Sequence, residues 1–140
     1  MSQTKKAAII TGGARGIGRG CALRLARSGC SIAIIDILDS EMASTKKEVK
    51  ELGCDCITFN ADVADYKKAK EIAREINGTF GTIDILVNNA GKSMPVGIIE
   101  ISEDEWDRTI DINLKSCFNW TQAVAPFMLK QEKGRIVSMS

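Results

Sequence analysis

The stretch Thr11-Gly12-Gly13-Ala14-Arg15-Gly16-Ile17-Gly18 decides the fold. It follows a short apolar run and precedes an amphipathic segment, so it is predicted to be the turn from a buried strand into a helix. Its glycines let the backbone turn tightly and approach a ligand without a Cβ in the way. The free N–H groups at the start of the helix then face one point, where a pyrophosphate fits. The spacing differs from GxGxxG, no Lys-Ser or Lys-Thr pair follows as in a P-loop, and a simple glycine-rich turn is the alternative.

The rest of the chain alternates short apolar runs with longer amphipathic segments. We expect strands at 7–10, 31–36, 56–59, 83–87 and 134–139, and helices at 16–28, 39–52, 65–76 and 103–130. Ser102 and Glu105 predict a capping box for the last helix, and Pro126 is expected to bend it. Strands separated by helices in this way form βαβ units, so the sequence predicts an α/β fold with a doubly wound parallel sheet in one domain over 1–140.

Composition excludes several classes of function. The 140 residues are 44% hydrophobic and 26% charged with a net charge of +1, so the chain gives no reason to expect a nucleic-acid or membrane partner. No histidine is present, which excludes Ser-His-Asp and Cys-His catalysis and nearly all zinc sites. No stretch approaches the ~18 apolar residues of a membrane span.

The cysteines indicate a reducing compartment. They are odd in number and scattered, at Cys21, Cys30, Cys54, Cys56 and Cys117. The CxC pair lacks the CxxC spacing of a zinc ribbon or a thioredoxin-type site. We therefore expect free, buried thiols and a cytoplasmic protein.

Asp36 ends the second predicted strand, 18 residues after Gly18. A carboxylate at this position can accept hydrogen bonds from both hydroxyls of an adenosine ribose, and it would repel a 2′-phosphate. Arg15 favours the opposite choice, because a cation beside the ribose could hold that phosphate. A surface aspartate that opens the next turn is the alternative for Asp36. The balance favours NAD over NADP.

Taken together, these motifs resemble the short-chain dehydrogenases/reductases. The resemblance rests on the TGxxxGxG turn, Asp36, Asp62-Val63, Asn88-Asn89-Ala90-Gly91 and Asn113 within Asp111-Ile112-Asn113-Leu114, in the family's order and spacing over the whole chain. It implies a Rossmann-like sheet of order 3-2-1-4-5, with NAD(P) across the carboxyl ends of the strands.

The resemblance also assigns roles to residues. The cofactor-binding set that it implies is Gly12, Arg15, Gly16, Ile17, Gly18, Asp36, Asp62, Val63, Asn89, Ala90 and Gly91. Asp62 and Val63 would contact adenine, and Asn113 would correspond to the family's catalytic asparagine, which anchors a water in a proton relay. Taken singly, each motif also suits a purely structural role: a helix cap at Asp62, a sheet-stabilising turn at Asn88 and a buried polar group at Asn113.

In this family a Ser, a Tyr and a Lys carry the chemistry. By the family's spacing the Ser would come immediately after Ser140, with Ser140 itself as the alternative, and the Tyr and Lys later. We therefore expect a truncated piece of a protein of about 250 residues, with an incomplete sheet edge and no turnover by itself. The one YxxxK present, Tyr66 to Lys70, lies next to the expected adenine contact and is interpreted as a solvated helix face.

The sequence thus predicts an NAD-dependent short-chain dehydrogenase/reductase that transfers hydride between nicotinamide and a small secondary alcohol or ketone. A non-catalytic NAD(P)-binding regulatory or redox-sensing protein is the alternative, and a sugar-nucleotide epimerase is a weaker one. Trp106 and Phe118 are expected to pack against the sheet. An exposed Trp120 or Phe127 resembles the family's subunit contact, which implies a homodimer or homotetramer.

Overall fold

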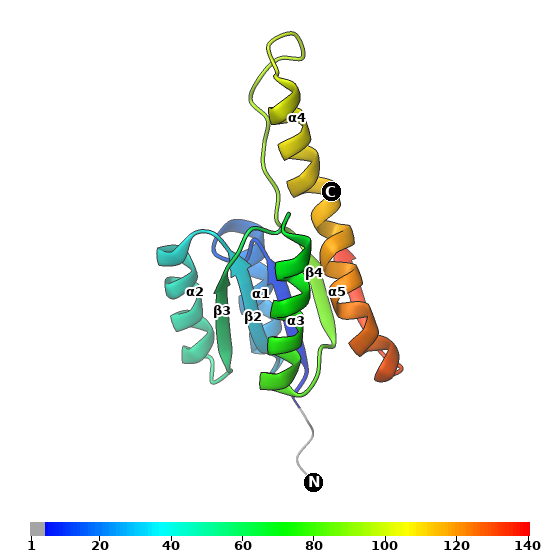
Figure 1. The fold of residues 1–140 in the computed structure, drawn as a ribbon. Coiled ribbons are helices and arrows are strands. Elements are labelled where there is room, and N and C mark those ends of the chain that lie inside the picture. Colours follow the sequence, from blue (N-terminus) through cyan, green and yellow to red (C-terminus); the bar gives the residue numbers. More distant parts are fainter. Residues whose placement is uncertain (1–4) are drawn as a thin grey trace.

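The computed structural model describes residues 5–140 as a parallel sheet with helices on both faces (Figure 1). Its strands are β1 (Ala7–Thr11), β2 (Ser31–Asp36), β3 (Cys56–Asn60), β4 (Ile85–Asn88) and β5 (Arg135–Ser138). All neighbouring pairs are parallel, in the order β3-β2-β1-β4-β5. The predicted α/β class and strand order are confirmed.

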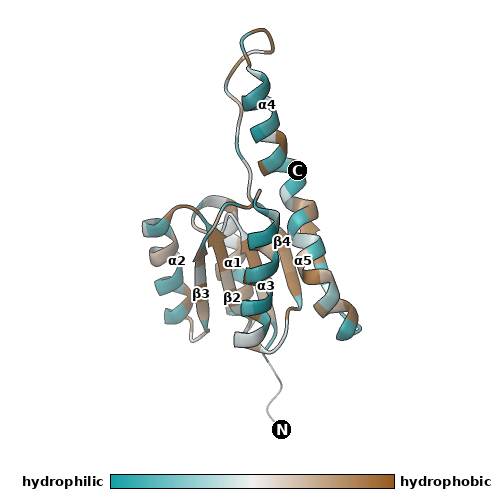
Figure 2. Cartoon of the chain, viewed as in Figure 1, coloured by the Kyte–Doolittle hydropathy of each residue, from teal (hydrophilic) through white to brown (hydrophobic). Residues whose placement is uncertain are grey.

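The helices form two layers, one on each face of the sheet, and leave the edge strand β5 exposed. They are α1 (Gly16–Arg27), α2 (Asp39–Glu51), α3 (Tyr66–Phe80), α4 (Glu103–Ile110), the π-helical turn η1 (Asp111–Lys115) and α5 (Ser116–Lys130). One core cluster joins a face of the sheet to α1 and α2, and the other joins the opposite face to α3 and α5. Alternate residues of β2 enter the two clusters, which explains why this strand is apolar throughout (Figure 2).

The helix over 103–130 differs from the prediction in two ways. The capping box of Ser102 and Glu105 is confirmed, but the helix is not α-helical throughout, because η1 interrupts it with a π turn. Pro126 lies inside α5, and the bend expected there stays a prediction. The helix also extends past the sheet, since α4 projects beyond the carboxyl ends of the strands (Figure 1).

The expected packing of the helix's aromatic residues is wrong. Trp106 and Phe118 do not pack against the sheet; they are 47% and 54% exposed. Trp120, expected on the surface, is 1% exposed in the core, and Phe127 packs partly buried against the same cluster. Trp106 cannot reach the sheet because α4 lies beyond it. The helix also has apolar residues on two faces, so its periodicity does not tell which face is buried.

The cysteines are free, as predicted, but only three of them are buried. Cys30, Cys54 and Cys56 are buried, whereas Cys21 and Cys117 are partly exposed. Burial raises the pKa of the Cys56 thiol to about 11, so this thiol stays protonated at neutral pH. Within residues 5–140, no helix has both the length and the apolar character needed to cross a membrane.

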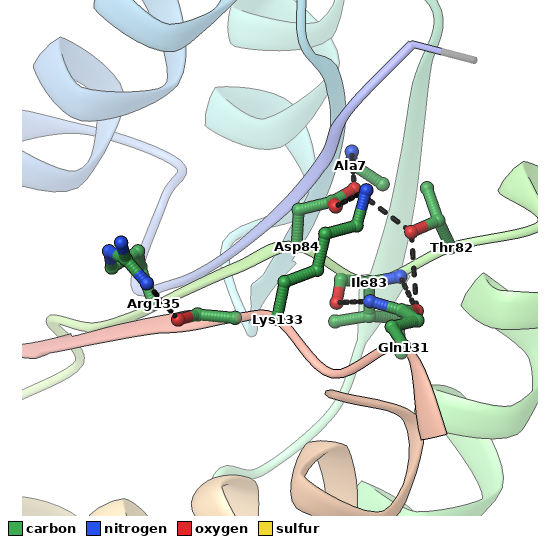
Figure 3. Close-up of polar contacts among 8 residues, drawn as sticks. Ala7, Thr82, Ile83, Asp84, Gln131, Lys133 and Arg135 are labelled. Atoms are coloured by element: carbon green, nitrogen blue, oxygen red, sulfur yellow. Dashed lines mark hydrogen bonds and ion pairs between the residues drawn. The ribbon is translucent and has the colours of Figure 1, made fainter. Parts of the chain in front are cut away.

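A buried carboxylate joins the amino ends of three strands. Asp84, directly before β4, accepts hydrogen bonds from the Ala7 N–H at 3.0 Å and the Thr82 hydroxyl at 3.0 Å (Figure 3). The ammonium of Lys133 lies 3.6 Å from its other oxygen. The backbone N–H of Asp84 donates to Ala7, and its carbonyl accepts from Arg135, so this one residue links β1, β4 and β5.

Replacing Asp84 with alanine should destabilise the protein by about 2 to 4 kcal/mol, because the buried Ala7 N–H loses its acceptor and the Thr82 hydroxyl keeps only Gln131. The control Lys133→Met removes only an exposed partner and should cost less than about 1 kcal/mol. Urea unfolding followed by circular dichroism measures both free energies. Similar losses for the two variants would contradict the role given to the carboxylate.

Candidate functional site

A cleft of about 570 Å³ opens at the carboxyl ends of β1 to β4, where the strand order reverses. The predicted cofactor residues that line it are Gly12, Arg15, Gly16, Asp36, Asp62, Val63, Asn89, Ala90 and Gly91. They come from the ends of four strands that are far apart in the sequence. Its size falls within the usual range of ligand and cofactor sites.

Two residues of the predicted set do not line this cleft. Ile17 is exposed at the start of α1, and Gly18 is buried beneath the glycine turn. A Cβ on Gly18 would overlap the carbonyl oxygen of Gly12 and the side-chain amide of Asn89. Gly18 therefore allows the close approach between helix and turn, while the cleft surface itself comes from Gly12 and Gly16.

The glycine turn is fastened to the end of β4 by side chains. The Thr11 hydroxyl accepts hydrogen bonds from the N–H groups of Asn89 at 3.0 Å and Ala90 at 3.1 Å. The Asn89 amide donates to the carbonyls of Thr11 and Gly12, each at 3.1 Å. Asn89 thus lines the cleft as predicted and also fixes the shape of the turn.

The start of α1 presents free backbone donors to the cleft. Arg15 occupies the N-cap without a side-chain hydrogen bond, and the first turn carries no acidic residue. Gly16 has a φ of +59°, which favours glycine, and a Cβ there would have no atom within 4 Å. Open space therefore borders an uncapped helix N-terminus, an arrangement that suits an anion such as a pyrophosphate.

Asp36 is held at the next strand end by backbone donors. One carboxylate oxygen accepts from the Ala14 N–H at 3.1 Å. The other accepts from the N–H groups of Ile37 at 2.8 Å and Leu38 at 3.3 Å. These backbone donors therefore position the carboxylate at the wall of the cleft.

Arg15 brings a positive charge to the same end of the cleft. The Ser40 hydroxyl lowers the pKa of Glu41 below its usual range, and the charge of Arg15 contributes a smaller lowering. The guanidinium thus acts on the start of α2, next to Asp36. Both the anion and the cation weighed in the choice between NAD and NADP are present here.

Asn113 lies beside the cleft rather than in its lining. Its side-chain oxygen accepts from the Lys92 N–H at 2.7 Å, and its amide donates to the Lys92 carbonyl at 2.8 Å. Lys92 itself lines the cleft, directly after Gly91. Asn113 therefore pins the segment that leaves β4 to the π turn of the long helix.

Two polar residues of the long helix that shape the cleft were missed from the sequence, as were Lys92 and Ser93 of its lining. Arg108 of α4 lines the cleft and forms an ion pair with Asp62 at 2.7 Å. Asn119 of α5 is fully buried and donates to the Val63 carbonyl at 3.1 Å. Both lie on a helix where charged and polar residues usually face solvent, so nothing local distinguished them. The one weak signal in the sequence is that Asn119 lies between the apolar residues Phe118 and Trp120.

The YxxxK motif lies outside the cleft. The Lys70 ammonium is 2.7 Å from the Tyr66 hydroxyl, which donates to Gln122 of α5 at 2.5 Å. The Tyr66 ring stacks on Phe118 with centroids 6.0 Å apart. The solvated face is confirmed for Lys67 and Lys68, which are exposed, but Lys70 is partly buried and joins Tyr66 in a contact between α3 and α5.

Comparisons with known proteins agree with this geometry. The family model described as short chain dehydrogenase matches residues 6–140. The 3-oxoacyl-[acyl-carrier-protein] reductase FabG of Staphylococcus aureus is 40% identical over 136 residues, which cover 96% of this chain and 55% of the relative. The oxidoreductase UcpA of Salmonella typhimurium is 42% identical over 137 residues, 98% of this chain and 52% of the relative.

Among solved structures, carveol dehydrogenase from Mycobacterium avium in complex with NAD is similar, with a TM-score of 0.91 and 33% identity. The match covers 96% of this chain and 54% of that one. The chain thus spans about half the length of the relatives that it matches.

Two glycine substitutions in α1 test the packing beneath the turn. Gly18→Ala should destabilise the protein by about 1 to 3 kcal/mol, because the added methyl group overlaps the Gly12 carbonyl. The matched control Gly20→Ala has no atom within 4 Å of its new Cβ and should stabilise the helix by about 0.5 to 1 kcal/mol. Urea unfolding measures both, and a Gly18→Ala protein as stable as the control would refute this account of the turn.

Proposed function

Because the chain belongs to the short-chain dehydrogenase family, we propose that it is the dinucleotide-binding domain of an oxidoreductase. The complete protein would transfer hydride between a nicotinamide and a small secondary alcohol or ketone. The observation that carries this proposal is the cleft in which Asp36 stands beside the uncapped N-terminus of α1. The N–H groups of the helix could donate hydrogen bonds to a pyrophosphate, and the Asp36 carboxylate could accept them from a ribose. The two together suit a dinucleotide.

Each part of the cleft suits one part of the cofactor. The free N–H groups at Gly16 would bind the pyrophosphate, Asp36 the adenosine ribose, and Asp62 with Val63 the adenine. Ala90 and Gly91 would line the path toward the nicotinamide, which supplies or accepts the hydride when the cofactor is bound. The residues that line the cleft therefore fit a nicotinamide dinucleotide.

We further propose that the cofactor is NAD rather than NADP. The Asp36 carboxylate is already fixed by three backbone N–H groups, so accepting ribose hydroxyls needs little reorganisation. The same negative charge would repel a 2′-phosphate, and we expect this repulsion to exceed the attraction of the exposed Arg15. The similar carveol dehydrogenase was solved with NAD, which supports this choice.

Asn113 is proposed to hold the water of the proton relay. Its two hydrogen bonds to Lys92 fix it next to the end of the cleft that follows Gly91. Tyr66 and Lys70 are assigned no part in the reaction, because they lie at the contact of α3 with α5. These 140 residues by themselves are expected to bind the cofactor without turnover.

An oligomer is also proposed, through a different surface from the one first expected. Four apolar residues of α4, η1 and α5 are exposed and recur at every fourth position, which gives the helix an apolar stripe: Trp106, Ile110, Leu114 and Phe118. A second copy is the partner that the family resemblance implies. We also propose a cytoplasmic location, which the free thiols support.

The NAD assignment is tested by titrating the protein with NADH and NADPH while following nicotinamide fluorescence. NADH should bind more tightly, and Asp36→Ala should reduce that preference at least about tenfold, because hydrogen bonds to a charged group are lost. The control Asp39→Ala removes the same charge from the start of α2, outside the cleft, and should keep the preference. Equal binding of the two cofactors by the unmodified protein would rule out the assignment.

In the complete protein, the role of Asn113 in the reaction can be measured separately from cofactor binding. Asn113→Ala should retain NADH affinity within about threefold while turnover falls roughly 100-fold, the usual scale of general acid–base contributions. Unchanged turnover would contradict the relay. Binding without any turnover in the unmodified complete protein would favour a regulatory protein instead.

The oligomer is tested by light scattering. The protein should have the mass of a dimer or tetramer, and Leu114→Glu should shift it toward the monomer by placing charge in the stripe. Leu52→Glu, at the exposed end of α2, is the control that should leave the mass unchanged. A monomeric mass for the unmodified protein would contradict the proposed contact.

A further inference from the structure

An ion pair forms between two residues that line the cleft. The Arg108 guanidinium of α4 lies 2.7 Å from one carboxylate oxygen of Asp62, in the segment that follows β3. Both residues line the cleft. Their side chains are 44% and 40% exposed, and ion pairs this accessible to water contribute little to folding stability. The pair is therefore better explained by what it does to the cleft.

Asp62 is held at both of its oxygens. Its other oxygen accepts a hydrogen bond from the Ala64 N–H at 2.9 Å. A carboxylate offers about four acceptor positions, so these two contacts fix its plane and leave further lone pairs for a ligand. Removing Arg108 would leave the Ala64 N–H as the remaining hydrogen-bond partner and free the carboxylate to rotate.

We infer that Arg108 is a positioning residue that orients the Asp62 carboxylate for recognition of an adenine base, an inference that rests on the proposed dinucleotide function. A fixed carboxylate accepts a hydrogen bond from the exocyclic amino group of adenine. It repels the keto oxygen that hypoxanthine carries at the same position. Arg108 thus acts on base selectivity through Asp62, and α4 provides the guanidinium from outside the sheet (Figure 1).

The experiment compares NADH with reduced nicotinamide hypoxanthine dinucleotide, which differs from NADH only in the base. Both are titrated by nicotinamide fluorescence into the protein, Arg108→Met, Arg108→Lys and Arg74→Met. Arg74 is an exposed arginine of α3 outside the cleft and serves as the matched control.

The unmodified protein and Arg74→Met should prefer NADH. Arg108→Met should lose about tenfold of that preference, the change expected for one well-placed hydrogen bond to a charged group, mainly through weaker NADH binding. Arg108→Lys keeps the charge but not the planar fork, so its preference should lie between the two.

A double-mutant cycle with Asp62→Asn makes the test independent of any general loss of stability. If Arg108 acts through Asp62, then Arg108→Met should leave the base preference unchanged when Asp62 is already asparagine. An undiminished effect of Arg108→Met in that background overturns the inference.

Two other outcomes also overturn it while leaving the proposed function in place. Equal weakening of both dinucleotides by Arg108→Met would mean that the ion pair only docks α4. A loss confined to NADPH, measured in parallel, would mean that Arg108 binds a phosphate. If the unmodified protein binds neither NADH nor NADPH, the proposed function itself fails.

Discussion

The tie between the carboxyl ends of β1 and β4 is the constraint on which the cleft depends. The Thr11 hydroxyl is buried and accepts from two successive N–H groups of the segment after β4, while the Asn89 amide returns two hydrogen bonds to the glycine turn. In a sheet of order 3-2-1-4-5, the chain leaves β1 and β4 toward opposite faces, which opens a crevice between them. β1 and β4 are already paired in the sheet, and these bonds continue the tie past the strand ends into the segments that form the walls of the crevice. The close approach of Gly18 to the Gly12 carbonyl holds the start of α1 against the same glycine turn.

The two ends of the sheet differ in whether their polar groups have hydrogen-bond partners. At the amino ends, Asp84 satisfies the Ala7 N–H and the Thr82 hydroxyl, and the Gln131 amide pairs with both backbone groups of Ile83 (Figure 3). At the carboxyl ends, the N-terminus of α1 has no side-chain cap. Buried donors left without partners are costly, whereas donors that face an open cleft are solvated until a ligand replaces the water. The hydrogen bonds at the amino ends therefore stabilise the sheet, whereas the free N–H groups of α1 at the carboxyl ends remain available to a ligand.

Much of this arrangement could be predicted from the sequence because its signals are local. The apolar run of β2, the glycine turn and the capping box at Ser102 each depend on residues that are neighbours in the chain, and the structure has all three. What the sequence did not reveal depends on which neighbour a helix meets. The side of α5 that faces the sheet is occupied by Asn119, Trp120 and Ala123, whereas Phe118 is exposed. Because α5 has apolar residues on both faces, tertiary packing decides which face lies against the sheet.

The long helix shows how a non-local choice builds the site. α5 is buried against the sheet, and from there the helix continues through η1 into α4, which lies beyond the strands (Figure 1). Along this path it contacts the cleft segments at three levels: Asn119 at the Val63 carbonyl, Asn113 at Lys92, and Arg108 at Asp62. The π turn at 111–115 contains the second of these contacts and adds a residue to the turn, which changes the relative direction of the side chains on its two sides. A single helix thus sets the positions of residues on two separate strand ends. Since the partners in these contacts depend on how the helix packs against the sheet, no pattern within either segment alone could have predicted which residues pair.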